Sequence, residues 1–168
     1  VLSPGAKPIV PPFPGKDLPG IFSLRNVPDG NQIKNWIDQH NVGRAVVVGA
    51  GFIGLEMAEN LTHRGIKVIL IDLADQVMPV LDAEMTAPLV QEMEKQGISI
   101  VLKDSVKKFE RTEQGLKVST SEGRKLFTDM VILAIGVAPD THLAKDAGIE
   151  TTDRGHIVVD EHMHTSAD

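Results

Sequence analysis

The residues Arg44-Ala45-Val46-Val47-Val48-Gly49-Ala50-Gly51-Phe52-Ile53-Gly54 set the architecture of this 168-residue chain. Residues 44–48 form an apolar run that is short enough for one buried parallel strand. The residues from Leu55 to Leu61 favour a helix. A strand, a glycine-rich turn and a helix in this order make the common string GxGxxG a dinucleotide-binding fingerprint.

Each glycine of the fingerprint has a separate expected task. Gly49 makes the tight turn, Gly51 lets the backbone approach a pyrophosphate, and Gly54 lets the helix pack closely on the strand. The N-terminus of the helix offers free N–H groups and a partial positive charge to the phosphates. The turn therefore supplies six candidate cofactor-binding residues: Gly49, Ala50, Gly51, Phe52, Ile53 and Gly54.

A second strand is expected over residues 67–71, and it ends at Asp72, eighteen residues after Gly54. A carboxylate at this point accepts hydrogen bonds from the adenine ribose hydroxyls and repels the 2′-phosphate of NADP. No Arg or Lys between Val68 and Glu94 could neutralise that phosphate, so we expect NAD(H) to be preferred over NADP(H). The alternative is a plain glycine turn with a charged residue that ends a strand.

The composition excludes several classes of site and partner. The net charge is −6, which argues against nucleic-acid binding. No apolar run reaches the length of a membrane helix and no signal peptide is visible, so we expect no membrane partner and a cytoplasmic location. The chain has no cysteine and no tyrosine, which excludes thiolate chemistry and a Tyr-Lys proton relay within it.

Proline dominates the start of the chain, where seven of the ten prolines lie within the first 28 residues. This predicts an extended arm over residues 1–28, with a short strand at 21–25. Asp29 is expected to cap a helix that runs to about Gln39.

More elements follow the first strand–helix–strand unit. We expect a helix at 83–96, kinked or shifted by Pro88, and a third parallel strand at 98–102. Glycine turns separate three short runs, which predicts an antiparallel meander over 106–111, 116–120 and 125–128. A buried strand at 130–135, a helix at 140–147 and a strand at 157–159 complete the chain.

Together these elements predict an α/β fold, a Rossmann-like doubly wound parallel sheet with an antiparallel β-meander crossover. In such sheets the ligand lies at the C-terminal ends of the strands. We therefore expect Gly49, Asp72 and Gly136 to converge there.

Two stretches of this chain match the motifs of a known family. Residues 49–59 match its glycine–helix motif almost residue for residue, and residues 134–140 match a strand–loop motif that usually ends in Pro-Asn, with Asp140 as a departure. The chain resembles the NADH-binding domain of the FAD-dependent pyridine nucleotide-disulfide oxidoreductases. The resemblance is to the branch with coenzyme A-disulfide reductase, NADH oxidase and NADH peroxidase.

The resemblance implies three parts. Residues 1–28 would be an arm leaving an absent FAD domain, 29–153 the NAD(H)-binding domain, and 154–168 a return segment toward the FAD domain. The FAD domain of the same parent chain and NADH would be the partners, and the parent would be a homodimer through a missing region. FAD would belong to the intact parent only, which would reduce a disulfide, a persulfide, oxygen or a peroxide.

The resemblance also implies roles for single residues. Phe52 would cover the nicotinamide site until the cofactor displaces it, Glu56 would orient the nicotinamide, and Gly136 would let the backbone approach its ribose. No catalytic residue is expected in this segment, which should bind nucleotide without turning it over.

Other interpretations stay open beside this one. A non-catalytic, NAD(H)-sensing regulatory module is the first alternative, and an S-adenosylmethionine-dependent methyltransferase is a more distant one. No metal site is predicted, because no cysteine joins the three histidines near the end of the sequence, His156, His162 and His164, and a terminal segment offers few neighbouring groups to support the ligands.

Overall fold

The structure, a computed structural model, describes residues 1–167 and divides into two compact units. One unit combines Val1–Ile9 with the segment that begins at Gly136, and the other is Val10–Ile135. The sequence-based domain limits at residues 28 and 153 stay predictions, and the last residue of the predicted return segment, Asp168, lies outside the described residues.

A five-stranded parallel sheet forms the centre of the unit Val10–Ile135. Its strands lie in the order β2 (Ile21–Ser23), β9 (Met130–Leu133), β3 (Arg44–Val48), β4 (Lys67–Ile71) and β5 (Ser99–Val101). Apolar side chains alternate between the two faces of β3, and the strand is buried on both.

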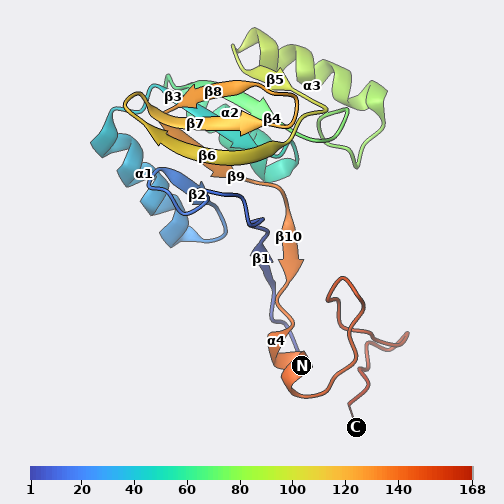
Figure 1. Cartoon of the computed structure of the whole chain (residues 1–168). Coiled ribbons are helices and arrows are strands. Elements are labelled where there is room, and N and C mark those ends of the chain that lie inside the picture. Colours follow the sequence, from blue (N-terminus) through green and yellow to red (C-terminus); the bar gives the residue numbers. More distant parts are fainter. Residues whose placement is uncertain (168) are drawn as a thin grey trace. The chain divides into compact units, whose positions relative to one another are not determined.

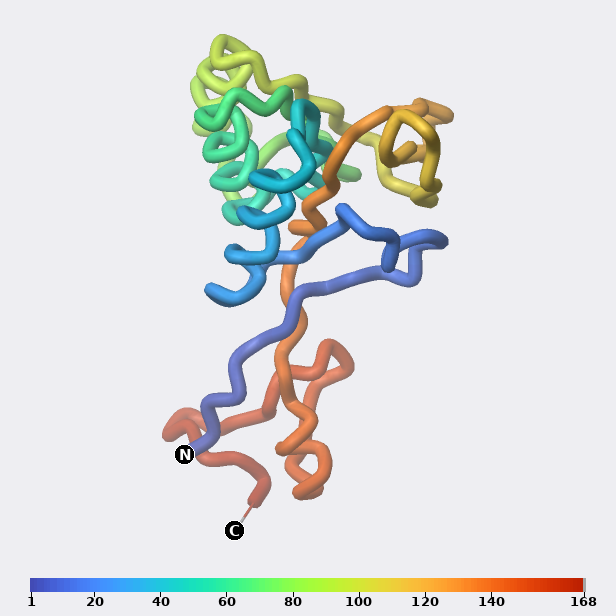
Figure 2. The backbone as a smooth tube through the Cα atoms, turned by 90° about the vertical axis from the view of Figure 1, so that its left-hand side faces the viewer, coloured from blue at the N-terminus to red at the C-terminus, as the bar shows by residue number. Residues whose placement is uncertain are grey.

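Three helices cover one face of this sheet, as Figure 2 shows. They are α1 (Val27–His40), α2 (Phe52–His63) and α3 (Ala83–Lys95). Buried side chains from the helices pack against Val47 of β3, Leu70 of β4 and Ile132 of β9; they include Ile33, Ala58, Leu61 and Met93. Burial of this apolar surface is the main favourable term that holds the helices on the sheet.

The meander covers the opposite face (Figures 1 and 2). It consists of β6 (Val106–Thr112), β7 (Gly115–Thr120) and β8 (Lys125–Thr128), paired antiparallel. Its Phe109 and Leu116 are buried in the same core cluster as Val46 of β3, and the ring of Phe13 meets that of Phe109 edge-on with centroids 6.0 Å apart. The predicted α/β class is confirmed, with the meander in place of helices on the second face.

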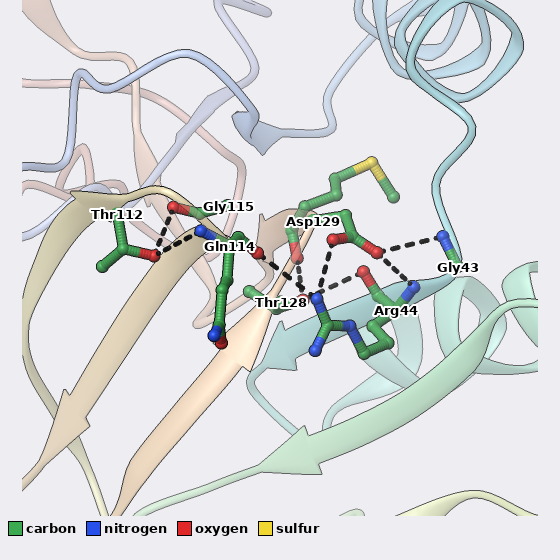
Figure 3. Close-up of polar contacts among 8 residues, drawn as sticks. Gly43, Arg44, Thr112, Gln114, Gly115, Thr128 and Asp129 are labelled. Carbon is green, nitrogen blue, oxygen red and sulfur yellow. Dashed lines mark hydrogen bonds and ion pairs between the residues drawn. The ribbon is translucent and has the colours of Figure 1, made fainter.

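An aspartate fastens the meander to the central sheet at the amino ends of its strands (Figure 3). Asp129 follows β8, and its carboxylate accepts hydrogen bonds from the backbone N–H groups of Gly43 (3.0 Å) and Arg44 (2.9 Å). The Arg44 guanidinium pairs with the same carboxylate at 3.1 Å and donates to the carbonyl of Gln114. Although burial raises the pKa of Asp129, Arg44 and the backbone donors outweigh it and hold that pKa below its usual range.

The other unit is small. Strands β1 (Ala6–Pro8) and β10 (Val137–Pro139) pair antiparallel, and α4 (His142–Asp146) follows. The predicted strand at 157–159 is wrong. Only Ile157 forms a bridge, to Thr151, and no neighbouring strand within the described residues of this unit continues the pairing.

The start of α1 also differs from the prediction. The N-cap is Asn26 and not Asp29: the Asn26 side chain accepts from the Asp29 N–H at 3.0 Å, and the Asp29 carboxylate accepts from the Asn26 N–H at 3.1 Å. Pro28 fits in the first turn because an N–H there has no helical partner. The end of the proline-rich stretch is therefore helical.

Pro88 lies inside α3, which begins at Ala83 as expected and runs to Lys95. Across residues 1–167, no helix combines the length and the apolar character that crossing a membrane requires.

Candidate nucleotide-binding site

The glycine turn between β3 and α2 has a backbone that tolerates no side chain at two of its positions. Gly49 has φ +109°, and a Cβ there would collide with the carbonyl of Ala134 at the end of β9. A Cβ on Gly54 would collide with the carbonyl of Gly49. These two glycines therefore bring turn, helix and neighbouring strand together, as the fingerprint predicts.

Gly51 is different, because the space beside it is open. A Cβ on Gly51 would meet no atom within 4 Å, and the residue is the N-cap of α2, with no side chain capping that end. The first turn of α2 carries no acidic residue. An open, uncapped helix N-terminus is the arrangement that accepts a phosphate group.

Asp72, directly after β4, is connected to the glycine turn by a hydrogen bond. One oxygen of its carboxylate accepts from the backbone N–H of Ala50, and the other accepts from the N–H of Ala74 at 2.8 Å. The structure thus brings together Gly49, Ala50, Gly51 and Asp72, which the sequence separates by up to 23 positions. Each carboxylate oxygen keeps a lone pair that can accept from a ligand hydroxyl.

Phe52 and Glu56 lie one helical turn apart on α2 and line the same cavity, which has a volume of about 270 Å³. Leu89 and Met93 of α3 and the loop residue Met78 form other parts of its wall. Phe52 is 67% exposed, so its ring is accessible to a ligand. The roles of Phe52 and Glu56 in nicotinamide binding stay predictions, as does that of the half-exposed Ile53.

Gly136 belongs to the other compact unit. Its φ is +115°, a conformation that favours glycine, and its carbonyl accepts from the Ile9 N–H at 2.9 Å. Its expected convergence with Gly49 and Asp72 stays a prediction.

Two further residues lie at this edge of the sheet that the sequence pattern does not predict there. Lys103 and Asp104 follow β5, and their backbone N–H groups donate to the carbonyls of Ala74 (2.9 Å) and Asp72 (3.1 Å). Lys103 lies beyond the stretch from Val68 to Glu94 that lacks Arg and Lys, so its sequence position alone does not place it near Asp72. The pairing of β4 with β5 is the signal that places it there.

Asp104 is fully buried and ionised. Burial raises the pKa of its carboxyl group, but hydrogen bonds from Thr120, the Glu122 backbone, Ser121 and the Arg124 guanidinium outweigh this effect and hold that pKa far below its usual range. The Arg124 contact is 2.7 Å long and is the one ion pair of this carboxylate among the described residues.

Comparison with known proteins identifies the family. The chain matches the pyridine nucleotide-disulphide oxidoreductase family over residues 1–168. It is 40% identical to the NADH oxidase of Methanocaldococcus jannaschii over 167 residues, which are 99% of this chain and 37% of that enzyme. The chain therefore spans little more than a third of the length of this relative.

Solved structures agree with the sequence match. The reduced Bacillus anthracis protein CoADR-RHD superimposes with a TM-score of 0.91 at 46% identity, over 97% of this chain and 29% of that protein. The water-forming NADH oxidase of Lactobacillus brevis, solved with NADH bound, gives a TM-score of 0.90 at 32% identity over 96% of this chain and 35% of the oxidase. An engineered variant of that oxidase, solved with NADPH bound, gives a TM-score of 0.89 at 31% identity, over 96% of this chain and 35% of the variant. With this agreement of sequence, fold and glycine-turn geometry, the chain belongs to the pyridine nucleotide-disulphide oxidoreductase family.

Proposed function

We propose that this chain is the NAD(H)-binding part of a FAD-dependent NADH oxidoreductase. The observation that carries the proposal is the contact between Asp72 and Ala50, which fixes a carboxylate beside the open N-terminus of α2. The helix end would hold the pyrophosphate, and the free lone pairs of Asp72 would accept from the adenine ribose hydroxyls.

The engineered Lactobacillus brevis variant supports a preference for NADH over NADPH. Its five substitutions replace a Gly, an Asp, an Ala, a Met and a Pro. In that order, these residues are separated from one another by 18, 1, 1 and 5 positions in the sequence, and the resulting enzyme is an NADPH oxidase. In this chain Gly54, Asp72 and Pro79 stand at the same intervals as the Gly, Asp and Pro of the parent oxidase. At these three positions this chain thus has the residues of the parent NADH oxidase and not those of the NADPH-dependent variant.

The residues of this chain bind and orient, and the nicotinamide supplies the hydride when bound. Phe52 would cover the nicotinamide position and move aside, Glu56 would orient the ring, and Gly136 would admit its ribose. Placement of this kind lowers the barrier to transfer because the reacting groups meet already aligned.

The partners of this unit follow from the family. We infer that a FAD domain of the same parent chain receives the hydride and that the parent is a cytoplasmic homodimer. Its final acceptor would be a disulfide, a persulfide, oxygen or a peroxide.

Calorimetric titration with NADH and NADPH tests the proposal. The chain is expected to bind NADH at least tenfold more tightly than NADPH, a gap of about 1.4 kcal/mol. Asp72→Ala should reduce this ratio toward one, because it removes both the ribose acceptor and the charge that repels the 2′-phosphate.

Asp75→Ala is the matched control, since it removes an exposed carboxylate three residues further along the same loop. Equal effects of the two substitutions would mean that only the net charge matters. Absence of NADH binding by the unmodified chain would contradict the proposed function itself. NADH oxidation by this chain alone would contradict its assignment as a binding part only.

A further inference from the structure

The ends of β4 and β5 stay paired beyond the two strands. The Asp72 N–H donates to the carbonyl of Val101 at 2.9 Å, and the Asp104 N–H donates back to the carbonyl of Asp72 at 3.1 Å. The Lys103 N–H donates to the carbonyl of Ala74 at 2.9 Å. One of these bonds joins the last residue of β5 to Asp72, and the other two connect the loop after β5 to the loop that carries Asp72.

This pairing needs a strained backbone. Lys103 has φ +56°, in the left-handed region that a lysine rarely occupies. Such a conformation is unfavourable for an L-residue with a side chain and persists only when neighbouring contacts hold it. The residue that follows it, Asp104, supplies those contacts.

Both oxygens of the Asp104 carboxylate are bonded to donors. Oδ1 accepts from the Ser105 N–H (2.9 Å), the Ser121 hydroxyl (2.8 Å) and the Glu122 N–H (3.0 Å), and Oδ2 accepts from the Arg124 guanidinium (2.7 Å). Three of these four donors lie in the turn between β7 and β8. Asp104 therefore fastens the loop after β5 to the meander, a separate layer of the unit.

A path of hydrogen bonds and one peptide link runs from the meander to the glycine turn. Asp104 is bonded to the meander and covalently joined to Lys103, the Lys103 N–H donates to the carbonyl of Ala74, and the Ala74 N–H donates to the Asp72 carboxylate. The other oxygen of that carboxylate accepts from Ala50. The direction in which the Asp72 oxygens point depends on this path, because both of their protein donors belong to loops.

We propose that Asp104 is a positioning residue for Asp72, and so sets how strongly the chain prefers NADH over NADPH. The inference rests on the proposed function for its ligand, but the hydrogen-bond path exists without one. Asp104 itself touches no cofactor in this scheme and acts through Lys103 and Ala74.

Asp104→Asn tests this, with Asp129→Asn as the matched control. Both residues are carboxylates that accept from two backbone N–H groups and an arginine, but Asp129 lies at the amino ends of the strands, away from the candidate site. Titration of the whole chain with NADH and NADPH should show the ratio of the two dissociation constants falling by about fivefold in Asp104→Asn. The ratio should not change in Asp129→Asn, because loss of overall stability affects both ligands equally.

Hydrogen exchange of backbone amides gives a second readout that needs no ligand. In Asp104→Asn the Ala50 and Ala74 amides should lose protection relative to Val47 in the core of β3, while Asp129→Asn keeps that relative protection. If Asp104→Asn does not fold, Ser121→Ala and Arg124→Gln each remove one donor to Asp104 and should give smaller effects in the same direction.

Two results would overturn the inference: an unchanged ratio of the dissociation constants in a folded Asp104→Asn variant, or unchanged relative protection of Ala50 and Ala74. If the unmodified chain bound neither nucleotide, the proposed function would fail, and the exchange data alone would still decide whether Asp104 positions Asp72.

Discussion

At the scale of single residues, Gly49 and Gly51 lie two positions apart but meet different requirements. Gly49 has a positive φ and has the carbonyl of Ala134, the residue directly after β9, against it, so the folded backbone itself excludes a side chain. Gly51 has φ −84° and open space beside it, so the fold would accept a methyl group there. Folding therefore does not require the glycine at 51, whereas the proposed contact with a pyrophosphate would require it.

Substituting each glycine with alanine should separate the two requirements. Gly49→Ala is expected to lower the free energy of unfolding by at least about 2 kcal/mol, from backbone strain and overpacking. Gly51→Ala should leave stability nearly unchanged and weaken NADH binding, because its methyl group would occupy the space that the pyrophosphate needs. Urea denaturation and calorimetry of both variants check this, and equal loss of stability in the two would contradict it.

The spacing of residues predicted part of this site and not the rest. Asp72 could be predicted because its distance from Gly54 in the sequence follows from one strand–helix–strand unit. The role of Asp104 could not, since its partners Ser121 and Arg124 come from a hairpin 17 and 20 residues further along, and no local pattern fixes which turn the loop after β5 meets.

At the scale of elements, the start of α1 shows where local rules suffice and where they do not. Both Asn26 and Asp29 are good N-cap residues, and in the structure they cap each other, with Asn26 in the N-cap position. The proline at 28 suggested extended chain, but a proline in the first helical turn is favourable. The helix therefore begins inside the stretch that proline content predicted to be extended.

Asn26→Ala should lower the free energy of unfolding by about 1 kcal/mol, because the N–H of Asp29 loses its acceptor. Asn31→Ala, at an exposed position within the same helix, is the control and should be neutral or slightly stabilising. Chemical denaturation followed by circular dichroism measures both. A loss in Asn31→Ala as large as in Asn26→Ala would show that the cap is not the cause.

Strands could be predicted where the strand is buried on both faces, because its sequence is then a continuous apolar run, as in β3, β4 and β9. The three-residue strand β10 was missed, and a strand at 157–159 was wrongly predicted, because short apolar runs do not reveal whether a partner strand is adjacent. The pairing of β10 with β1 joins residues 129 to 133 positions apart in sequence.

At the scale of the whole molecule, two carboxylates fasten the layers of the larger unit at opposite ends of its sheet. Asp104 is near the carboxyl ends of the strands and Asp129 near their amino ends, and each has its pKa lowered by hydrogen bonds and an arginine. A carboxylate whose pKa is lower in the folded state than in the unfolded state stabilises the fold at pH values above its unfolded-state pKa of about 3.9. This stabilisation is lost as the pH falls through the folded-state pKa.

The free energy of unfolding should therefore decrease as the pH falls below about 5. The difference in stability between the unmodified chain and Asp104→Asn should narrow between pH 7 and pH 3, since the variant has no carboxyl group to protonate there. Urea midpoints at the two pH values measure this. A difference that widened toward acid would contradict the lowered pKa of Asp104.

The backbone hydrogen bond between Ile9 and Gly136 has a consequence for how this protein could have arisen. The unit Val10–Ile135 leaves and rejoins the rest of the chain at two neighbouring points, since each of its ends is covalently attached to one of these two bonded residues. A cassette with adjacent ends can be inserted into a host gene at a single position without separating the two halves of the host protein. Recombination could thus transfer this unit from one host protein to another without breaking the fold of either.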